Sequence, residues 1–278
     1  MHPEQQLSIA RNSEGATSMA VISPIGAALT ELTLAGVQIV SHKAAGEPKS
    51  MFFGSLLAPW PNRLAGGSYS FEGRTLAHTI LDSQQNANHG LLFERALGVT
   101  DQSESSISFS YGFGSDEGYP FAIELIVKYT ITEDEFRFDA SATNLGQPAL
   151  FGLGFHPYFL VGEKFAFSAD FTNRITVDEK MIPIGEESIA GFTYSGGNLD
   201  DCFYGTKTAK LETESYQLEL SISKGFEYFM LYRPNQSAVS MLAIEPMSCR
   251  TNAFNTHLSE VLIAENETKT YGFSIRKS

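Results

Sequence analysis

Cysteine and basic residues are both scarce in this sequence. Two cysteines, Cys202 and Cys249, occur among 278 residues, and no Cys-x-x-Cys pair is present. This count argues against the usual structural zinc site, and a chain of this length does not need a disulfide for stability. Both cysteines are therefore expected to be small core residues.

Positive charge is in short supply as well. The 32 acidic and 19 basic residues give a formal charge of −13. A surface of this sign repels phosphate backbones and anionic lipids, so neither a nucleic acid nor a membrane is expected as a partner. A small neutral or weakly charged molecule remains compatible with this charge.

Long apolar runs are also missing. Residues 1–6 lack the basic segment and apolar core of a secretory signal. The apolar stretch 19–29 is too short to span a bilayer. We therefore expect a cytoplasmic protein, and its 42% hydrophobic residues are enough for a sizeable core.

Helical periodicity is absent, and alternation of apolar and polar residues takes its place. It is clearest in segments 106–113, 123–131, 135–142, 218–222 and 271–275. A period of two is typical of half-buried antiparallel strands. No repeat and no long linker divides the chain. We predict one all-β domain spanning residues 1–278, a large antiparallel β-sandwich.

Several connections can be placed on this pattern. Residues 132–135 are expected to join two strands as a hairpin. The Gly- and Pro-rich stretches 58–67 and 191–197 are short enough to be loops. A short helical turn is possible after His257.

Two ionisable residues stand in apolar surroundings. His156 lies among aromatic residues and glycines, and Glu245 follows an apolar run. Each directly precedes a proline, which favours an extended, stiff strand end. Such residues can donate and accept protons at fixed positions, although a hydrogen-bonded core histidine and a structural glutamate at a turn are the alternatives.

Three further segments carry polar groups that could face a cleft. Trp60 and Arg63 lie in a loop with two prolines that would present an aromatic face and a guanidinium. His89 follows a pair of asparagines and precedes a glycine. Asp200 and Asp201 are adjacent, so only one of them can face a site from a strand.

Other catalytic motifs are absent from the sequence. It contains no Gly-x-Ser-x-Gly, Walker or His-Glu-x-x-His motif, and no dinucleotide-binding glycine motif between a strand and a helix. No metal ion or other cofactor is therefore expected.

In their order along the chain, these segments resemble the aldose 1-epimerase (galactose mutarotase) family. The match comprises Asn62-Arg63 with Gly67, Tyr69 and Phe71, then His89-Gly90, His156-Pro157-Tyr158-Phe159, Asp200-x-x-Phe203, and Glu245-Pro246 leading to Asn252-Ala253-Phe254-Asn255. The resemblance implies a galactose mutarotase-like β-supersandwich, and an isomerase that interconverts the α and β anomers of a free aldohexose.

The resemblance also assigns roles to residues. Glu245 matches the general base that takes the proton of the anomeric hydroxyl, and His156 matches the general acid that protonates the ring oxygen. Arg63, His89 and Asp200 match residues that bind sugar hydroxyls. A carboxylate in the pocket is expected to raise the pKa of His156 and keep its proton available.

Four residues complete the prediction. Asn62 belongs to the motif and is expected near the substrate, and Asp201 replaces Asp200 if the register differs by one. Trp60 and Phe203 are plausible walls of the pocket. A small-molecule sugar is the expected partner, and the choice between monomer and homodimer stays open.

Three other functions compete with this one. A 1-epimerase for hexose 6-phosphates or other anionic sugars, including sulfonated ones, needs a basic pocket; Lys164, Arg174 and Arg250 are candidates by charge alone. A carbohydrate-binding protein without turnover would not need the acid and base. A glycoside hydrolase needs two carboxyl groups flanking the scissile bond.

Overall fold

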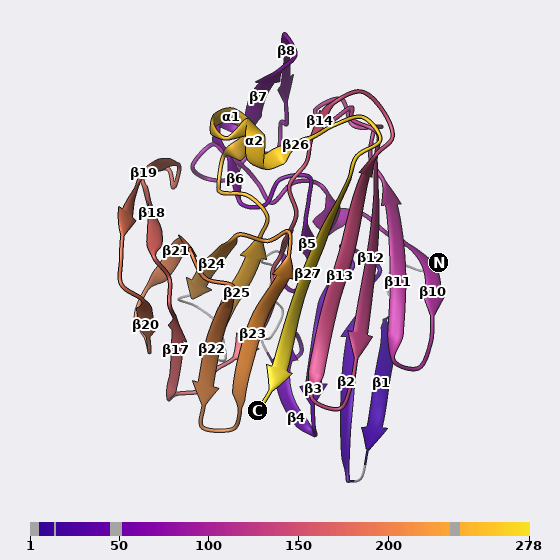
Figure 1. Ribbon diagram of the computed structural model, residues 1–278, viewed down its shortest axis with the longest axis vertical. Coiled ribbons are helices and arrows are strands. Elements are labelled where there is room, and N and C mark those ends of the chain that lie inside the picture. The colour runs from indigo at the N-terminus through magenta and orange to yellow at the C-terminus, as the bar shows by residue number, and fades with distance from the viewer. Residues whose placement is uncertain (1–5, 14, 45–51, 234–239) are drawn as a thin grey trace.

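Antiparallel strands form most of the chain and are arranged mainly in three sheets (Figure 1). The computed structural model describes residues 6–13, 15–44, 52–233 and 240–278. The largest sheet has nine strands. In order across the sheet these are β10 (Gly98–Gln102), β11 (Ser106–Gly112), β12 (Ile123–Ile131), β13 (Glu135–Asn144), β27 (Thr268–Lys277), β23 (Gln217–Lys224), β22 (Thr208–Thr213), β17 (Phe165–Ala169) and β20 (Phe192–Tyr194).

The second large sheet carries most of the residues discussed below. Its strands are β19 (Pro183–Ser188), β18 (Asn173–Val177), β21 (Leu199–Tyr204), β24 (Tyr228–Arg233), β25 (Met241–Met247), β15 (Gly154–Phe155) and β5 (Leu56–Leu57), with β16 (Tyr158–Leu160) also paired to β25. A four-stranded sheet contains β1 (Leu7–Ser13), β2 (Ala16–Ile22), β3 (Leu29–Leu34) and β4 (Val37–Ser41).

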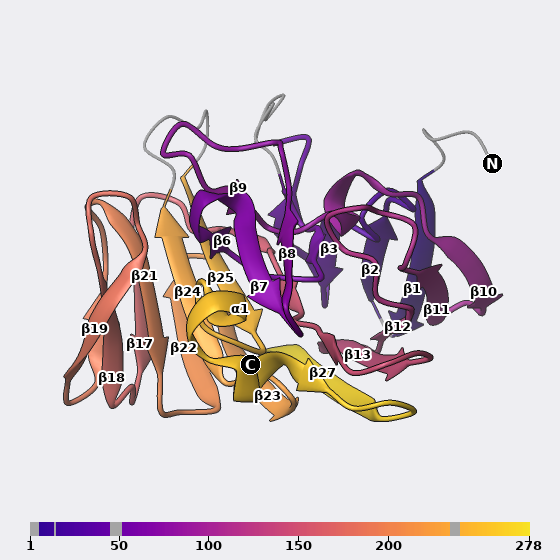
Figure 2. The ribbon, with the colours of Figure 1, turned by 90° about the horizontal axis from the view of Figure 1, so that it is seen from above.

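Short elements gather at one end of the large sheets, at the top of Figure 1 and in the foreground of Figure 2. They include the pairs β6 (Arg63–Leu64) with β9 (Ala87–Asn88), β7 (Ser68–Phe71) with β8 (Arg74–Ala77), and β14 (Ala149–Leu150) with β26 (Leu262–Ile263). The helical turns are α1 (Ala253–Thr256), α2 (Leu258–Val261) and the 3₁₀ turns η1 (Ala65–Gly67) and η2 (Leu92–Glu94).

Aromatic side chains join the two large sheets. Phe138 of β13 stacks on Phe155 of β15 with ring centroids 5.5 Å apart, and Phe192 of β20 lies 4.4 Å from Phe203 of β21. Rings of this size bury much apolar area and contribute strongly to the stability of the core. The packing confirms the predicted all-β sandwich.

The alternating patterns predicted the central strands well. The pattern in 123–131 coincides with β12, in which the alternating residues Ile123, Leu125, Val127, Tyr129 and Ile131 are buried while most of the intervening ones, including Ile126, are exposed. The 132–135 hairpin is present, and α2 begins directly after His257. Both cysteines are free and buried, as expected.

Two of the predicted loops are not purely irregular. The stretch 191–197 contains strand β20, and the stretch 58–67 contains β6 and η1. Both strands are only two or three residues long, so they show no periodicity of their own. Each forms because a distant strand, β17 or β9, provides its hydrogen-bonding partner.

Candidate functional site

His156 lies between two short strands of the second sheet, β15 and β16. Its backbone is fixed on both sides, because its N–H donates to the Ser55 carbonyl and its own carbonyl accepts from the Gly54 N–H. The Tyr158 ring stacks on the imidazole at 4.8 Å with an interplanar angle of 20°. The histidine therefore has a fixed position at a strand end, as the following proline predicted.

Glu245 lies inside β25, and the prediction that it ends a strand was wrong. The strand continues through Pro246, which stands opposite Phe229 of β24, to Met247. Proline keeps an extended backbone and removes only one ladder donor, so β25 can pass through it. All seven residues of β25 are buried, and the Glu245 carboxylate is among the groups shielded from solvent.

The two side chains meet although they lie far apart in the sequence. His156 Nε2 is 3.2 Å from Glu245 Oε1, and their side chains are 4% and 2% exposed. His156 Nδ1 and Glu245 Oε2 are buried and have no hydrogen-bond partner among the residues that the structure describes. Buried polar atoms without a partner are rare in folded proteins, so this pair has unused capacity for a bound molecule.

Burial controls the protonation of the pair. It lowers the pKa of His156 to about 3 and raises the pKa of Glu245 well above its usual 4.5. Nearby Asp200 raises the pKa of Glu245 further, and Arg63 partly opposes that change. The expected upward shift of the His156 pKa was wrong in direction, because desolvation of the imidazolium outweighs the opposing effect of a backbone hydrogen bond.

His89 approaches the same point from another loop. Its ring lies 5.3 Å from that of His156, and its Nδ1 accepts a hydrogen bond from the Asn62 N–H at 3.1 Å. Burial lowers the pKa of His89 well below 6.5, so the ring is neutral. An accepting Nδ1 leaves the single ring hydrogen on Nε2, which can then donate to an oxygen of a ligand.

The same tautomer bears on metal binding. Ligating atoms of His89, His156 and Glu245 all lie within 4.8 Å of one another, which is the kind of cluster that can hold a metal ion. A ring nitrogen that carries hydrogen has no lone pair for a metal, so the Asn62 bond disfavours His89 Nε2 as a ligand. The cluster fits a hydrogen-bonded organic ligand better than a metal ion.

A glycine holds the His89 loop against the 58–62 segment. Gly90 has a φ of +72°, and a Cβ at this position would lie 2.2 Å from the Ala58 carbonyl oxygen. Only glycine tolerates both the backbone conformation and this approach. The close approach brings His89 next to Asn62, whose carbonyl also accepts from the His89 N–H.

Arg63 and Asp200 form the polar end of the site. Arg63 Nη2 lies 3.7 Å from Asp200 Oδ2, and Arg63 Nε lies 3.5 Å from Asp82 Oδ2. Asn62 Oδ1 accepts from the Arg63 backbone N–H at 2.8 Å, so Asn62 supports both Arg63 and His89. Burial raises the pKa of Asp200, and Arg63 counteracts part of this shift.

Asp201 lies outside the site. The two aspartates alternate along β21, and the Asp201 carboxylate binds Arg174 of β18 with Nη2 to Oδ1 at 2.7 Å. The structure therefore brings Asp200, not Asp201, to Arg63. The doubled aspartate in the sequence left this choice open, and strand alternation decides it.

Neither predicted wall residue lines the site. Trp60 is 3% exposed and contacts His78 and Phe254, whereas Phe203 is fully buried in the core between the two sheets. Trp60 is buried because the loop it occupies packs inward and does not display the ring to solvent.

Besides Tyr158, two rings near the site come from residues that the sequence had not singled out. Phe52 stands 4.5 Å from His89, and Tyr232 lies opposite Asp200 on the neighbouring strand. The pKa of Tyr232 is raised by burial and by Asp200. Asp82 was missed as well. Nothing in the local pattern around these three residues distinguishes them from ordinary strand or turn residues.

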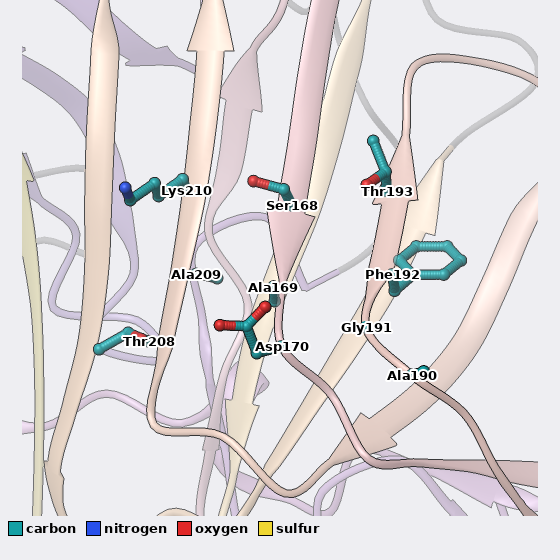
Figure 3. A pocket seen from close by; sticks show the side chains of 10 residues that line it. All are labelled: Ser168, Ala169, Asp170, Ala190, Gly191, Phe192, Thr193, Thr208, Ala209 and Lys210. Carbon is teal, nitrogen blue, oxygen red and sulfur yellow. The ribbon is translucent and has the colours of Figure 1, made fainter.

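A depression lies elsewhere on the surface, away from the His156–Glu245 pair. It has a volume of about 400 Å³ and opens where β17, β20 and β22 meet. Figure 3 shows polar lining residues, with Ser168, Thr193 and Lys210 on these strands and Asp170 directly after β17, beside the small residues Ala169 and Ala209. No predicted site residue lines it, so it is separate from the His156–Glu245 pair.

Comparison with known families matches residues 10–276 to the model for aldose 1-epimerases. The chain belongs to the aldose 1-epimerase family. It is accordingly an isomerase that acts on carbohydrates.

Relatives of this epimerase family cover the chain to different extents. The uncharacterized protein YihR of Escherichia coli is 27% identical over 277 residues, which is 92% of this chain and 89% of YihR. Galactose mutarotase of Homo sapiens is 27% identical over 150 residues, covering 50% of this chain and 43% of that protein.

The fold has close counterparts among solved structures. The GalM/aldose epimerase homologue of C. elegans superposes with a TM-score of 0.82 and covers 99% of both chains at 20% identity. This likeness shows a galactose mutarotase-like fold. In the part of the chain that the structure describes, no helix is both long and apolar enough to cross a membrane.

Proposed function

We propose that this epimerase interconverts the α and β anomers of a free aldohexose by acid–base opening and closing of the ring. The contact between His156 Nε2 and Glu245 Oε1 carries the proposal. The two oxygens that must lose and gain a proton, the anomeric hydroxyl and the ring oxygen, are bonded to the same carbon. An acid and a base that act on them must therefore converge, as these two side chains do.

Each residue has a distinct role in the proposed reaction. Glu245 takes the proton of the anomeric hydroxyl while His156 gives a proton to the ring oxygen, and the bond between the anomeric carbon and the ring oxygen breaks. The open aldehyde rotates about its C1–C2 bond and closes on its other face. Arg63, Asp200 and the Nε2–H of His89 hold the remaining hydroxyls during this rotation.

The proton content of the pair suits this chemistry. With the pKa of Glu245 raised and that of His156 lowered, the pair holds one proton across a broad pH range. Moving this proton from the carboxyl group to the imidazole produces the carboxylate base and the imidazolium acid. The transfer changes no net charge, so burial opposes it less than it opposes a separate charge.

Charge pairing supports a neutral sugar over a phosphorylated or sulfonated one. Each cation considered as an anion-binding residue has a carboxylate partner: Lys164 with Glu214, Arg174 with Asp201 and Glu187, and Arg250 with Glu260 and Glu186. Arg63 itself lies between two aspartates. An anionic group on the sugar would find little net positive charge, because these carboxylates already neutralise the cations.

An anomerisation assay tests the proposal directly. Freshly dissolved α-D-galactose, α-D-glucose, glucose 6-phosphate and a 6-sulfonated glucose are followed by polarimetry or NMR exchange with and without protein. We expect acceleration of at least one neutral hexose and a lower kcat/KM for both anionic sugars. Preference for an anionic sugar would refute the neutral assignment, and decay at the blank rate for all four would leave a binding protein. In a separate incubation with an aryl glycoside, release of the aryl group would indicate a hydrolase.

The adjacent aspartates provide a matched pair of variants. Asp200→Asn removes a charged hydrogen-bonding group from the site, so kcat/KM is expected to fall roughly tenfold to a hundredfold. Asp201→Asn loses only the partly exposed pair with Arg174, whose contribution to stability is typically below about 1 kcal/mol. Its kcat/KM is expected to stay near the wild-type value. Equal losses in the two variants would contradict the assignment of Asp200.

A further inference from the structure

Arg63 has one carboxylate partner that is not itself a candidate for binding sugar. Its side chain is 15% exposed, and its Nε faces Asp82 Oδ2 at 3.5 Å while its Nη2 faces Asp200 at 3.7 Å. A sugar that binds Arg63 and Asp200 must compete with their mutual attraction. The Asp82 contact is made by Nε and the Asp200 contact by Nη2, so the two carboxylates face different nitrogens of the guanidinium.

Hydrogen bonds within its own turn hold the Asp82 carboxylate in place independently of Arg63. Its Oδ1 accepts the N–H groups of Gln84 and Asn86, both at 2.9 Å. The Asp82 N–H donates to the Asn86 carbonyl, and the Gln85 N–H donates to the Asp82 carbonyl, which closes the turn. With Oδ1 occupied, Oδ2 is the oxygen that points to Arg63.

The turn is also attached to the segment that carries Arg63. Asn86, which is 2% exposed, accepts the Gly66 N–H through its side-chain oxygen at 3.3 Å. Ala87 then pairs with Leu64 in the β6–β9 ladder. These bonds tie the Asp82 turn to the chain on the C-terminal side of Arg63.

A second turn in the chain repeats this geometry without an arginine. Asp178 Oδ1 accepts the N–H groups of Lys180 and Ile182 at 2.9 Å. As in the Asp82 turn, the Asp178 N–H donates to the Ile182 carbonyl, and the Met181 N–H donates to the Asp178 carbonyl. The two turns touch, since Asn86 Nδ2 donates to the Lys180 carbonyl. Among the described residues no ion pair involves Asp178, so the turn itself does not require one.

We propose that Asp82 is a positioning residue that holds the Arg63 guanidinium in place beside Asp200, so that the arginine and the aspartate together present donors and an acceptor to the hydroxyls of a sugar. Without the Asp82 charge, Asp200 is the one ion-pair partner left to the guanidinium among the described residues, and the guanidinium shifts toward it. The inference rests on the proposed function and deepens it, because it names what sets the geometry of hydroxyl recognition.

Asp82→Asn isolates the charge from the turn. Asparagine keeps an Oδ1 that accepts both N–H groups, and it replaces the oxygen facing Arg63 with an uncharged amide. We expect KM for the best hexose of the panel to rise roughly tenfold while kcat changes less than about threefold, because Glu245 and His156 do not contact Asp82. The matched control Asp178→Asn is expected to leave both constants unchanged.

Two further measurements distinguish positioning from general stability. In an Arg63→Met background, Asp82→Asn is expected to add no further loss, because its effect passes through Arg63. Independently of turnover, NMR of ¹⁵N-arginine protein is expected to show faster exchange of the Arg63 Nε–H in Asp82→Asn but not in Asp178→Asn.

The outcomes separate this inference from the proposed function. An active wild type with KM unchanged in Asp82→Asn overturns the positioning role alone, as do additive losses in the Arg63→Met background. If wild type turns over no hexose, the proposed function fails, and the Arg63 exchange rate still decides whether Asp82 holds the arginine. An exchange rate equal in both variants overturns it.

Discussion

Glu245→Gln is expected to lower kcat between about 10²- and 10⁴-fold for the sugar that wild type turns over best. Glutamine keeps the size and one acceptor oxygen of the side chain but cannot take the proton of the anomeric hydroxyl. The His156 contact at 3.2 Å shows that the lost oxygen lies beside the proposed acid. Polarimetry with subtraction of the spontaneous rate measures the change.

A second buried carboxylate controls for the substitution itself. Glu31 lies on β3 of the four-stranded sheet, is 8% exposed and accepts from the Gln38 side chain at 3.0 Å. Glu31→Gln is expected to retain wild-type kcat. Loss of activity in both variants would attribute the effect to folding and not to proton transfer.

Stability is expected to change in the opposite direction from activity. Because burial raises the folded-state pKa of Glu245, the native protein holds a proton that the unfolded chain has lost above the usual pKa of 4.5. This contribution to stability declines as pH rises toward the folded-state pKa. Glutamine does not ionise, so Glu245→Gln should have a higher Tm than wild type at pH 8. A lower Tm would contradict a raised pKa of Glu245 in the folded protein.

The central strands could be predicted from the sequence because the polarity of each side chain indicates which face of the sheet it occupies. The alternation in 123–131 gave β12 residue by residue. The pairing of β13 with β27 could not be read this way, since it joins residues 135–144 to 268–277 through long-range register. Short strands such as β20 depend on a distant partner and have no local signal.

The site was predictable to the extent that chemistry is local. His156, Glu245, Arg63, His89 and Asp200 were selected from their neighbours in sequence and from the family resemblance, and the structure brings them together. The pKa of His156 was mispredicted, because burial depends on the whole fold. Asp82 was not predicted for a similar reason. Its turn resembles that of Asp178, and its contact with Arg63 depends on how the chain folds.

His156→Gln is expected to lower kcat by a similar factor, about 10²- to 10⁴-fold, and also to change the shape of the pH profile. In wild type the reacting state is the pair with one proton. It is lost below the pKa of His156, about 3, and above the raised pKa of Glu245. The kcat/KM profile should therefore be bell-shaped, with its accessible alkaline limb reporting loss of the last proton of the pair.

In the His156→Gln variant, Glu245 is the one member of the pair that still titrates, and its ionised form is the base. The residual activity is expected to rise with pH through the Glu245 pKa, so the falling limb of wild type becomes a rising limb. His78→Gln is the matched control, since His78 is partly buried beside Trp60 and its pKa is also lowered by burial. The control should keep the wild-type bell. A falling limb that survives in His156→Gln would assign the last proton to another group and remove His156 from the role of acid.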